Sequence, residues 1–367
     1  MKKGSIRMNP ENAIKQFEIG ELESIKPFGD GLINSSYLAI NTDKKRYILQ
    51  RINTELFTDV DGLMNNIQLV TDFLKKKIME RGGDPERETL TVIHTKDDQP
   101  YYMDDENNAW RVYPFIENTV VYNQAQSPEQ FYLTGLSFGK FQNELNEFDA
   151  TQLVEVIEKF HDTRHRYTQF EEALENDPAN RVNEVQDEIN FIKARKDDAY
   201  FLYDLLDKGE LPLRVTHNDT KLSNILLDKD TQEGIAVIDL DTIMPGILLF
   251  EFGDSIRSGA NTTVEDDPNL DHVNFDMELF EAYTKGFLEG AKDIMTEKEL
   301  ELLPWGARII TLEQAMRFLT DYLNGDTYYA ITHDSHNIER ARNQIKLVSE
   351  MERLWPEITK LVKEIAS

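Results

Sequence analysis

The sequence predicts an α+β fold in two lobes, with a small antiparallel sheet in residues 1–117 and a mostly helical lobe in residues 118–367. Short apolar runs separated by glycine and polar turns fill the first third of the chain, which is typical of antiparallel strands. Helical apolar stripes replace that pattern afterwards. The chain of 367 residues is long enough for two cores, because single cores stop growing near ~250–300 residues.

The first lobe begins with Asn9-Pro10, an expected helix cap followed by proline at the first helical position. Strand-like runs then alternate with turns, and one helical stripe interrupts them. The expected elements are strands near 22–28, 37–40, 47–52, 90–93 and 100–103, a helix at 56–77, and a crossing into the second lobe at 110–116.

The second lobe begins with another cap, Ser127-Pro128, followed by an apolar stripe through Phe131, Phe138 and Phe141. The remaining expected elements are helices at 182–206, 277–288, 307–323 and 339–365, a strand at 211–215, and a surface loop at 261–273. The chain has no internal repeats.

Composition excludes several classes of protein. A formal net charge of −28 argues against nucleic acid or an anionic membrane as the main partner, since both attract clustered positive charge. Without cysteine there is no disulfide, thiolate nucleophile or zinc-thiolate site. No run approaches the ~18 apolar residues of a membrane span, and the basic start lacks the apolar run of a secretory signal. We therefore expect a cytoplasmic protein, whose oligomeric partners the sequence leaves unknown.

Residues 215–241, VTHNDTKLSNILLDKDTQEGIAVIDLD, contain the residues expected to perform the chemistry. Asp219 lies two positions after His217, Asn224 follows five positions later, and Asp239 and Asp241 end a second apolar run. This is the spacing of a phosphoryl-transfer loop followed by a metal-binding aspartate. We expect Asp219 to accept the proton of the acceptor hydroxyl, and His217 to stiffen the loop.

The segment after the loop predicts a β-hairpin, because two short apolar runs flank a polar stretch that ends in Gly234. A turn centred between Thr231 and Gln232 would place Asn224 opposite Asp239, where both could hold one Mg²⁺. Asp241 is a further candidate ligand. Any one of these residues alone is more often a helix cap or a turn residue. The prediction rests on finding Asp219, Asn224 and Asp239 together with a hairpin of matching length.

Gly29-Asp30-Gly31 lies between two expected strands and would let backbone amides approach nucleotide phosphates. Asn34 holds the place of the third glycine in G-x-G-x-x-G, and the alternative is an ordinary hairpin turn. The adenine is expected to stack in the hinge around residues 113–117, from Tyr113 to Glu117.

Two further pairs have structural interpretations. His161 and His165 are four residues apart and could bind a metal if they lay on a helix, but Thr163 and the local charges predict a loop. No third ligand is nearby, so a structural role is preferred. Asp254 and Arg257 are expected to brace the catalytic loop through a buried charge-assisted pair or through backbone hydrogen bonds.

The segments FGDGLIN, YILQRIN, WRVYPFIENT, FHDTRHRY, THNDTKLSNIL, AVIDLDTIMPG and MRFLTDYLNGDTYY occur in this order from about Phe28 to Lys346. With them the chain resembles the N-acetylhexosamine 1-kinases of the aminoglycoside phosphotransferase and choline kinase superfamily. The resemblance implies a protein-kinase-like fold with a nucleotide-binding first lobe and a catalytic, sugar-binding second lobe. The implied reaction moves the γ-phosphoryl of ATP, with Mg²⁺, to the 1-hydroxyl of a neutral amino sugar, N-acetylglucosamine or N-acetylgalactosamine.

The resemblance also assigns residues. It implies that Gln50 stands where kinases have the strand lysine that pairs with phosphates, which shifts charge neutralisation to the metal. It implies sugar contacts by Asn34, Arg317 and Tyr328 in addition to Asp219. Leu32 departs from the histidine known in the family. From the residues alone, Arg317 could instead pair with Asp321 one turn on.

Two alternatives remain open at the level of sequence. Another small-molecule kinase of the superfamily, acting on choline, homoserine or an aminoglycoside, would share the loop and differ in the C-terminal helices. A catalytically dead ATP-binding regulator is the second, and the intact set of Asp219, Asn224 and Asp239 argues against it.

Overall fold

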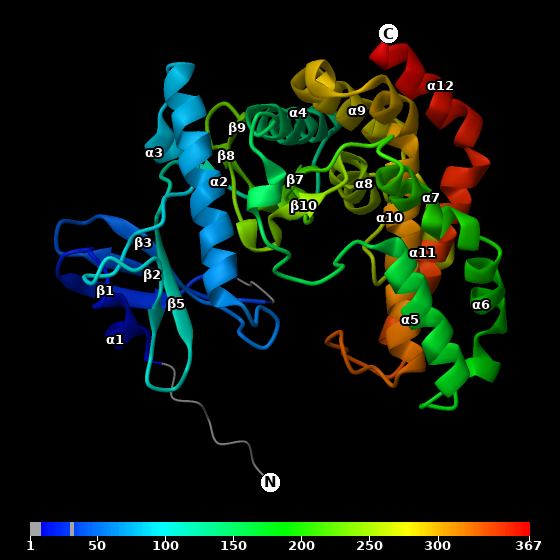
Figure 1. The fold of residues 1–367 in the computed structure, drawn as a ribbon, viewed down its shortest axis with the longest axis horizontal. Helices are drawn as coiled ribbons and strands as arrows, with labels where there is room; N and C mark the ends of the chain where they lie inside the picture. Colours follow the sequence, from blue (N-terminus) through cyan, green and yellow to red (C-terminus); the bar gives the residue numbers. More distant parts are fainter. Residues whose placement is uncertain (1–8, 30–32) are drawn as a thin grey trace. The chain divides into compact units, whose positions relative to one another are not determined.

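The computed structural model describes residues 9–29 and 33–367. The chain divides into two compact units, residues 1–119 and residues 120–367. Figure 1 traces the first unit in blue to cyan and the second in green to red. The short strand β6 (Thr119–Val120) spans the division.

The first unit is built on a five-stranded antiparallel sheet in the order β1-β2-β3-β5-β4. Its core contains Ile14, Phe17, Ala39, Leu49 and Trp110, so the first helix packs on the sheet. The elements are α1 (Pro10–Ile14), β1 (Leu22–Pro27), β2 (Ser35–Asn41), β3 (Arg46–Arg51), α2 (Val60–Glu80), α3 (Pro85–Glu88), β4 (Tyr102–Met103) and β5 (Ala109–Pro114).

The prediction of a strand at residues 90–93 is wrong. These residues form a single bridge, from Ile93 to Val112 of β5. Leu90 is buried, so the run is apolar because it packs inside the unit, and not because it belongs to the sheet.

The second unit is mostly helical, and α10 is its longest helix, drawn in orange in Figure 1. A core cluster of α5, α6, α7, α10 and α11 includes Phe170, Ile192, Met316 and Leu319. The elements are α4 (Pro128–Glu144), α5 (Thr163–Asn176), α6 (Gln186–Lys193), α7 (Lys196–Asp207), β7 (Arg214–Thr216), β8 (Ile225–Asp228), β9 (Gly234–Val237), β10 (Met244–Gly246), α8 (Leu248–Gly259), α9 (Met277–Ala291), α10 (Glu297–Leu323), α11 (His336–Arg353) and α12 (Trp355–Ala366).

Two predicted helices are each divided in the structure. The stretch 182–206 forms a short 3₁₀ turn, α6 and α7, with a break at Arg195, which has a non-helical φ of −116°. The stretch 339–365 breaks at Leu354, one residue before α12 begins, with Pro356 in its first turn. Proline lacks the N–H that a continuing helix needs. Helix α10 begins ten residues before the predicted Ala307. The loop predicted at Thr163 is wrong, because α5 begins there and the Asp162 side chain caps its first turn.

Helices α8 and α10 cross with their backbones in contact. A Cβ added to Gly253 would lie less than 3.0 Å from the carbonyl oxygen of Gly306, and one added to Gly306 less than 3.0 Å from that of Leu249. Because only glycine lacks Cβ, this pair permits the close approach. The crossing fixes the distance between the two helices that flank the predicted catalytic loop.

Candidate active site

The catalytic loop leaves β7, which pairs antiparallel with β10. Asn218 turns the chain sharply, with φ of 64°, in the left-handed region that asparagine tolerates better than most residues. Its side-chain amide donates to the carbonyls of Thr216, at 3.1 Å, and Thr242, at 2.8 Å. The Thr242 hydroxyl in turn donates to the His217 carbonyl at 2.7 Å. These bonds tie the loop to the segment that follows the hairpin.

Glu251 on α8 holds the backbone of the catalytic loop. This role was not predicted from the sequence. Its fully buried carboxylate accepts the backbone N–H groups of His217 and Asn218, both at 2.8 Å, and the side-chain amide of Gln142 at 2.7 Å. Burial raises the pKa of Glu251 above its usual value, and the backbone N–H groups of Asn218 and His217 oppose this rise. Since all three partners donate, the ionised form is the one that satisfies them.

His217 is a neutral imidazole with its proton on Nε2. That nitrogen lies 2.8 Å from the carbonyl oxygen of Ile238, which can only accept, whereas Nδ1 accepts the backbone N–H of Asp219 at 3.2 Å. Both nitrogens are engaged with backbone. His217 therefore stiffens the loop, in line with the interpretation drawn from the sequence.

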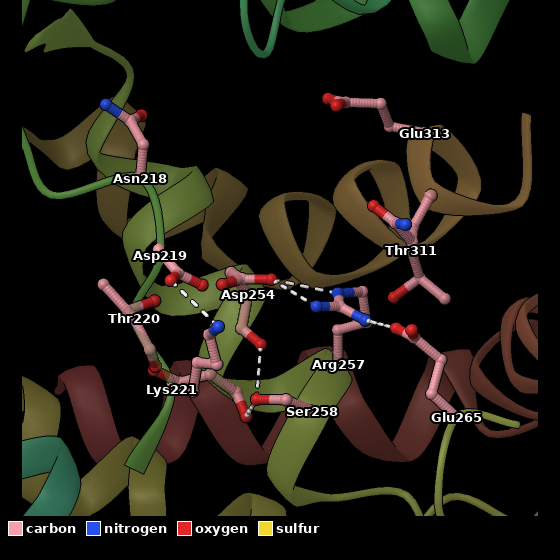
Figure 2. Close-up of polar contacts among 12 residues, drawn as sticks. Asn218, Asp219, Thr220, Lys221, Asp254, Arg257, Ser258, Glu265, Thr311 and Glu313 are labelled. Atoms are coloured by element: carbon pink, nitrogen blue, oxygen red, sulfur yellow. Dashed lines mark hydrogen bonds and ion pairs between the residues drawn. The ribbon is translucent and has the colours of Figure 1, made fainter. Parts of the chain in front are cut away.

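The Asp219 carboxylate is partly exposed and contacts two neighbours in the loop. Oδ2 lies 3.0 Å from the ammonium nitrogen of Lys221 and accepts the side-chain amide of Asn224 at 3.0 Å. Burial lowers the pKa of Lys221, but Asp219, Asp254 and Asp239 outweigh it and raise the pKa above its usual value. Figure 2 shows Lys221 extended toward Asp219 and Asp254. A carboxylate thus lies beside a cation in the loop.

The predicted pair of Asp254 and Arg257 is present on α8, with 2.9 Å between carboxylate and guanidinium. Arg257 also contacts Glu265, as Figure 2 shows. Burial raises the pKa of Asp254, but Arg257 together with His161 and Lys221 outweighs it, so the pKa lies below its usual value. Asp254 is ionised and adds negative charge beside Lys221.

The hairpin β8-β9 brings Asn224 and Asp239 together with a register one residue from that expected. Ile225 pairs with Val237, a bulge follows Leu226, and the backbone N–H of Ile238 donates to the Asn224 carbonyl at 2.9 Å. Asn224 therefore lies opposite Ile238, and Asp239 follows directly.

The predicted metal ligands fit a hard cation. The Asn224 amide nitrogen is occupied by Asp219, at 2.8 Å from its carbonyl and 3.0 Å from its carboxylate, which leaves the amide oxygen as the ligand atom. Asp239 is exposed, with φ of 61°, and Asp241 is buried two residues on. Across residues 9–29 and 33–367, no three His, Asp or Glu side chains form a metal cluster by themselves. Phosphate oxygens of a nucleotide normally complete such a shell.

In the first unit, Gln50 is bound to Arg111, which sequence reasoning missed. The Gln50 amide oxygen accepts two guanidinium bonds from Arg111, at 2.9 and 3.1 Å, and its amide nitrogen donates to Ser36 at 3.1 Å. Arg111 lies directly opposite Gln50 in the sheet and is 1% exposed. Gln50 occupies the position where kinases have a lysine, and the buried guanidinium of Arg111 on the neighbouring strand lies beside it.

The other residues predicted in this unit are placed as follows. Gly29 has φ of 72°, and Asp30 and Gly31 lie outside the described residues. The buried Asn34 accepts the backbone N–H of Asn53 at 3.0 Å. The Glu117 carboxylate pairs with Arg46.

A pocket of about 330 Å³ in the second unit contains both predicted sugar contacts from α10 and the turn after it. Its lining includes Arg166, Gln169, Arg317, Thr320, Tyr328 and Tyr329. The guanidiniums of Arg166 and Arg317 are partly buried here. Burial, followed by the charge of Arg317, lowers the pKa of Arg166. The wall offers guanidinium and hydroxyl donors, and the carboxylates of Glu172 and Asp321 also line it.

The alternative pairing of Arg317 with Asp321 is not formed. Arg317 lies 3.6 Å from Glu313, one turn earlier. Asp321 instead accepts the backbone N–H groups of Thr327, Tyr328 and Tyr329 at 2.8 to 3.0 Å. This carboxylate folds the turn that brings Tyr328 to the pocket.

No helix in the described part of the chain is long and apolar enough to cross a membrane. A sequence profile described as the phosphotransferase enzyme family matches residues 24–288.

Three solved structures are similar in fold. An aminoglycoside phosphotransferase from Alicyclobacillus acidocaldarius is 12% identical over 97% of each chain, with a TM-score of 0.63. An amicoumacin kinase in complex with AMP-PNP, Ca²⁺ and Ami is 11% identical over 92% of this chain and 91% of that chain, with a TM-score of 0.59. A microcompartment-associated aminopropanol kinase is 13% identical over 95% and 97%, with a TM-score of 0.58. The likeness confirms the predicted kinase-like α+β fold.

Proposed function

This chain belongs to the phosphotransferase enzyme family, and we propose that it transfers the γ-phosphoryl of ATP to the anomeric hydroxyl of an N-acetylhexosamine. The observation that carries the proposal is the Asp219 carboxylate, held by its loop beside Lys221 and Asn224. A carboxylate next to a fixed cation suits a hydroxyl that must lose its proton as it attacks phosphorus.

In the proposed mechanism, Asp219 orients the 1-hydroxyl and accepts its proton. The ammonium of Lys221 stabilises negative charge on the transferred group. Asn224 and Asp239, with Asp241 as a further candidate, would hold Mg²⁺, which supplies positive charge to the nucleotide phosphates when bound. Glu251 keeps the loop backbone in place through His217 and Asn218.

The nucleotide is proposed to contact the first unit through Gly29, Asp30, Gly31, Gln50 and Glu117. The close bonding of Gln50 to Arg111 supports this assignment, because it gives the sheet a cation where kinases have a lysine.

The acceptor is proposed to contact Asn34, Asp219, Arg317 and Tyr328. Support for the last two is that both line the same pocket. Arginine and tyrosine donate hydrogen bonds to hydroxyl and acetyl oxygens without requiring a charged ligand. A neutral amino sugar fits these donors, and a cytoplasmic location fits a chain without cysteine.

An ATP-coupled assay tests the proposal with N-acetylglucosamine, N-acetylgalactosamine, choline, homoserine and an aminoglycoside as acceptors. We expect turnover with the acetylated sugars and a sugar 1-phosphate product by ³¹P NMR, with Asp219→Asn as the inactive control. The second candidate function is a kinase for a cationic acceptor, because a protein with a net charge of −28 attracts cations. Turnover with choline or an aminoglycoside alone would support this second candidate in place of the first. Mg-ATP binding in a thermal-shift titration without turnover of any acceptor would indicate the catalytically dead ATP-binding regulator.

A further inference from the structure

His161 lies just before α5, between the catalytic loop and α10. Its Nε2 lies 3.1 Å from the carbonyl oxygen of Asn218, and its Nδ1 lies 2.9 and 3.2 Å from the two carboxylate oxygens of Glu313. The imidazole side chain is 10% exposed and that of Glu313 is 1% exposed. Both interactions are therefore shielded from water.

The two partners determine the protonation of the ring. The Asn218 carbonyl can only accept, so Nε2 has a proton. The Glu313 carboxylate also accepts, so Nδ1 has one as well. An imidazole with two N–H groups is cationic. A metal ion at His161, the alternative open to His161 and His165 in the sequence, would need a bare nitrogen that this ring lacks.

Charged groups on the surrounding elements agree with this assignment. Burial raises the pKa of Glu313, but His161, Arg317 and Arg166 outweigh it and keep the pKa below its usual value. Burial lowers the pKa of His161, and the positive charge of Arg317 lowers it further. The carboxylate of Glu313 outweighs both effects, so the pKa is raised above its usual value. The carboxylate of Asp254 on α8 also interacts favourably with the cation.

The contacts form a continuous path from the reacting group to the acceptor pocket. Asn218 directly precedes Asp219 in the loop, and His161 binds its carbonyl. Glu313 binds the other side of the ring and lies 3.6 Å from Arg317, which lines the pocket with Tyr328. Figure 2 shows Asn218 and Glu313 on separate elements, with Asp219 directly after Asn218 in the loop.

We propose that the His161 imidazolium is a positioning residue that holds the catalytic loop in register with the acceptor pocket through Glu313. This proposal rests on the proposed function for the identity of the acceptor. His161 binds the Asn218 carbonyl, so it acts through the loop backbone. When the ring loses a proton, one of its nitrogens can no longer donate, and either the loop or Glu313 loses its bond.

Titration of the wild-type protein tests the protonation state without any substitution. We expect ¹⁵N NMR of the His161 ring to report two N–H groups at pH 7 and a titration midpoint above 6.5, the usual value for histidine. A neutral ring at pH 7, or a midpoint at or below 6.5, would overturn the proposal.

His161→Gln tests the coupling, with His165→Gln on α5 as the matched control. We expect His161→Gln to lower kcat/KM for the acceptor about tenfold, equivalent to ~1.4 kcal/mol, without changing Mg-ATP affinity. The fall in wild-type kcat/KM as pH rises through the His161 titration should be absent from this variant. The proposal is contradicted if His161→Gln and the wild type have equal kcat/KM values. It is also contradicted if kcat/KM of the variant still falls as pH rises.

Hydrogen exchange of the amides in residues 217–221 adds a readout that needs no acceptor. We expect faster exchange there in His161→Gln than in His165→Gln, and unchanged exchange would count against the proposal. If the wild type does not phosphorylate N-acetylhexosamines, the proposed function fails, whereas the ring titration and the loop exchange still decide the role of His161. If His161→Gln does not fold, the wild-type titration and the pH dependence of wild-type loop exchange decide it.

Discussion

The carboxylate of Glu251 binds backbone N–H groups of the catalytic loop. A buried charge is costly unless donors satisfy it, and here two amides of the catalytic loop and one side-chain amide do so. The sequence offered one signal, a glutamate within the apolar run ILLFEFG, where a charge needs a partner. It could not identify the partner, because Glu251 and His217 are 34 residues apart.

Glu251→Gln should loosen the loop, since the amide nitrogen of glutamine cannot accept a backbone N–H. One buried donor left unpaired costs ~1–3 kcal/mol. We expect a lower free energy of unfolding by urea denaturation and a lower kcat, and Glu210→Gln, at an exposed position, serves as the control. A variant with wild-type kcat would show that the loop does not need this carboxylate.

Asp219→Asn and Asp239→Asn should fail in different ways. The first removes the proposed proton acceptor, and general-base catalysis is worth ~10²–10⁴ in rate, so turnover should fall by about that factor while Mg-ATP still binds. The second removes a proposed metal ligand, so Mg-ATP binding itself should weaken. Isothermal titration with Mg-AMP-PNP and steady-state kinetics separate the two effects, and a shared phenotype would reject the separate assignments.

The pair of His161 and Glu313 should make stability depend on pH. The raised pKa of His161 gives a contribution that is fully present below 6.5 and is lost as pH rises through the folded-state pKa. The lowered pKa of Glu313 gives a contribution present above 4.5 that is lost as pH falls through its folded-state pKa. The difference in unfolding free energy between wild type and His161→Gln should therefore be largest between about 4.5 and 6.5 and shrink at higher pH. A difference that grows with pH would contradict the assignment.

At the scale of elements, apolar periodicity predicted most helices but not their breaks. The break at Leu354 had a signal in Pro356, which belongs in the first turn of a new helix. The break at Arg195 had none, because no glycine or proline is nearby. There the guanidinium binds Glu352 of α11 at 2.6 and 2.8 Å, a contact that depends on the tertiary fold. The hairpin was predicted, but Asn224 lies opposite Ile238, one residue from the expected partner Asp239.

Gly253→Ala should separate α8 from α10. The added methyl would lie less than 3.0 Å from backbone atoms of Gly306 and Ala307, which cannot rotate away as a side chain can. Overpacking of this kind costs ~1–3 kcal/mol. We expect a lower Tm by calorimetry and a lower kcat, since α8 also holds Glu251. Ser258→Ala on the same helix is the control, and equal Tm values for the two variants would refute the tight crossing.

At the scale of the whole molecule, the class of reaction followed from one 27-residue stretch, and the family profile agrees with it. The acceptor did not follow in the same way. Arg317 and Tyr328 are separated by ten residues, and they share a pocket only because Asp321 folds the turn between them. A carboxylate that binds backbone leaves no spacing pattern in a sequence. Pockets of this kind therefore require a structure.

The net charge of −28 should make the folded protein sensitive to salt. Charges of one sign repel in the compact state, and at ~0.15 M salt the screening length falls to ~8 Å. We expect Tm to rise between 10 mM and 150 mM NaCl, as approximate conditions for this screening effect. Tetramethylammonium chloride should give the same rise, which separates screening from specific binding of Na⁺. A falling Tm would mean that surface ion pairs outweigh the repulsion.

The contact of Gly253 with Gly306 has a consequence for how this protein could change in evolution. Beyond the crossing, the later turns of α10 lead to Glu313 and Arg317, whereas α8 holds the loop of Asp219. Substitutions along the pocket face of α10 that keep Glu313 could alter which acceptor is recognised without moving Asp219, because the helix remains anchored at the glycines. New specificities would thus be accessible by single steps that each preserve the reaction.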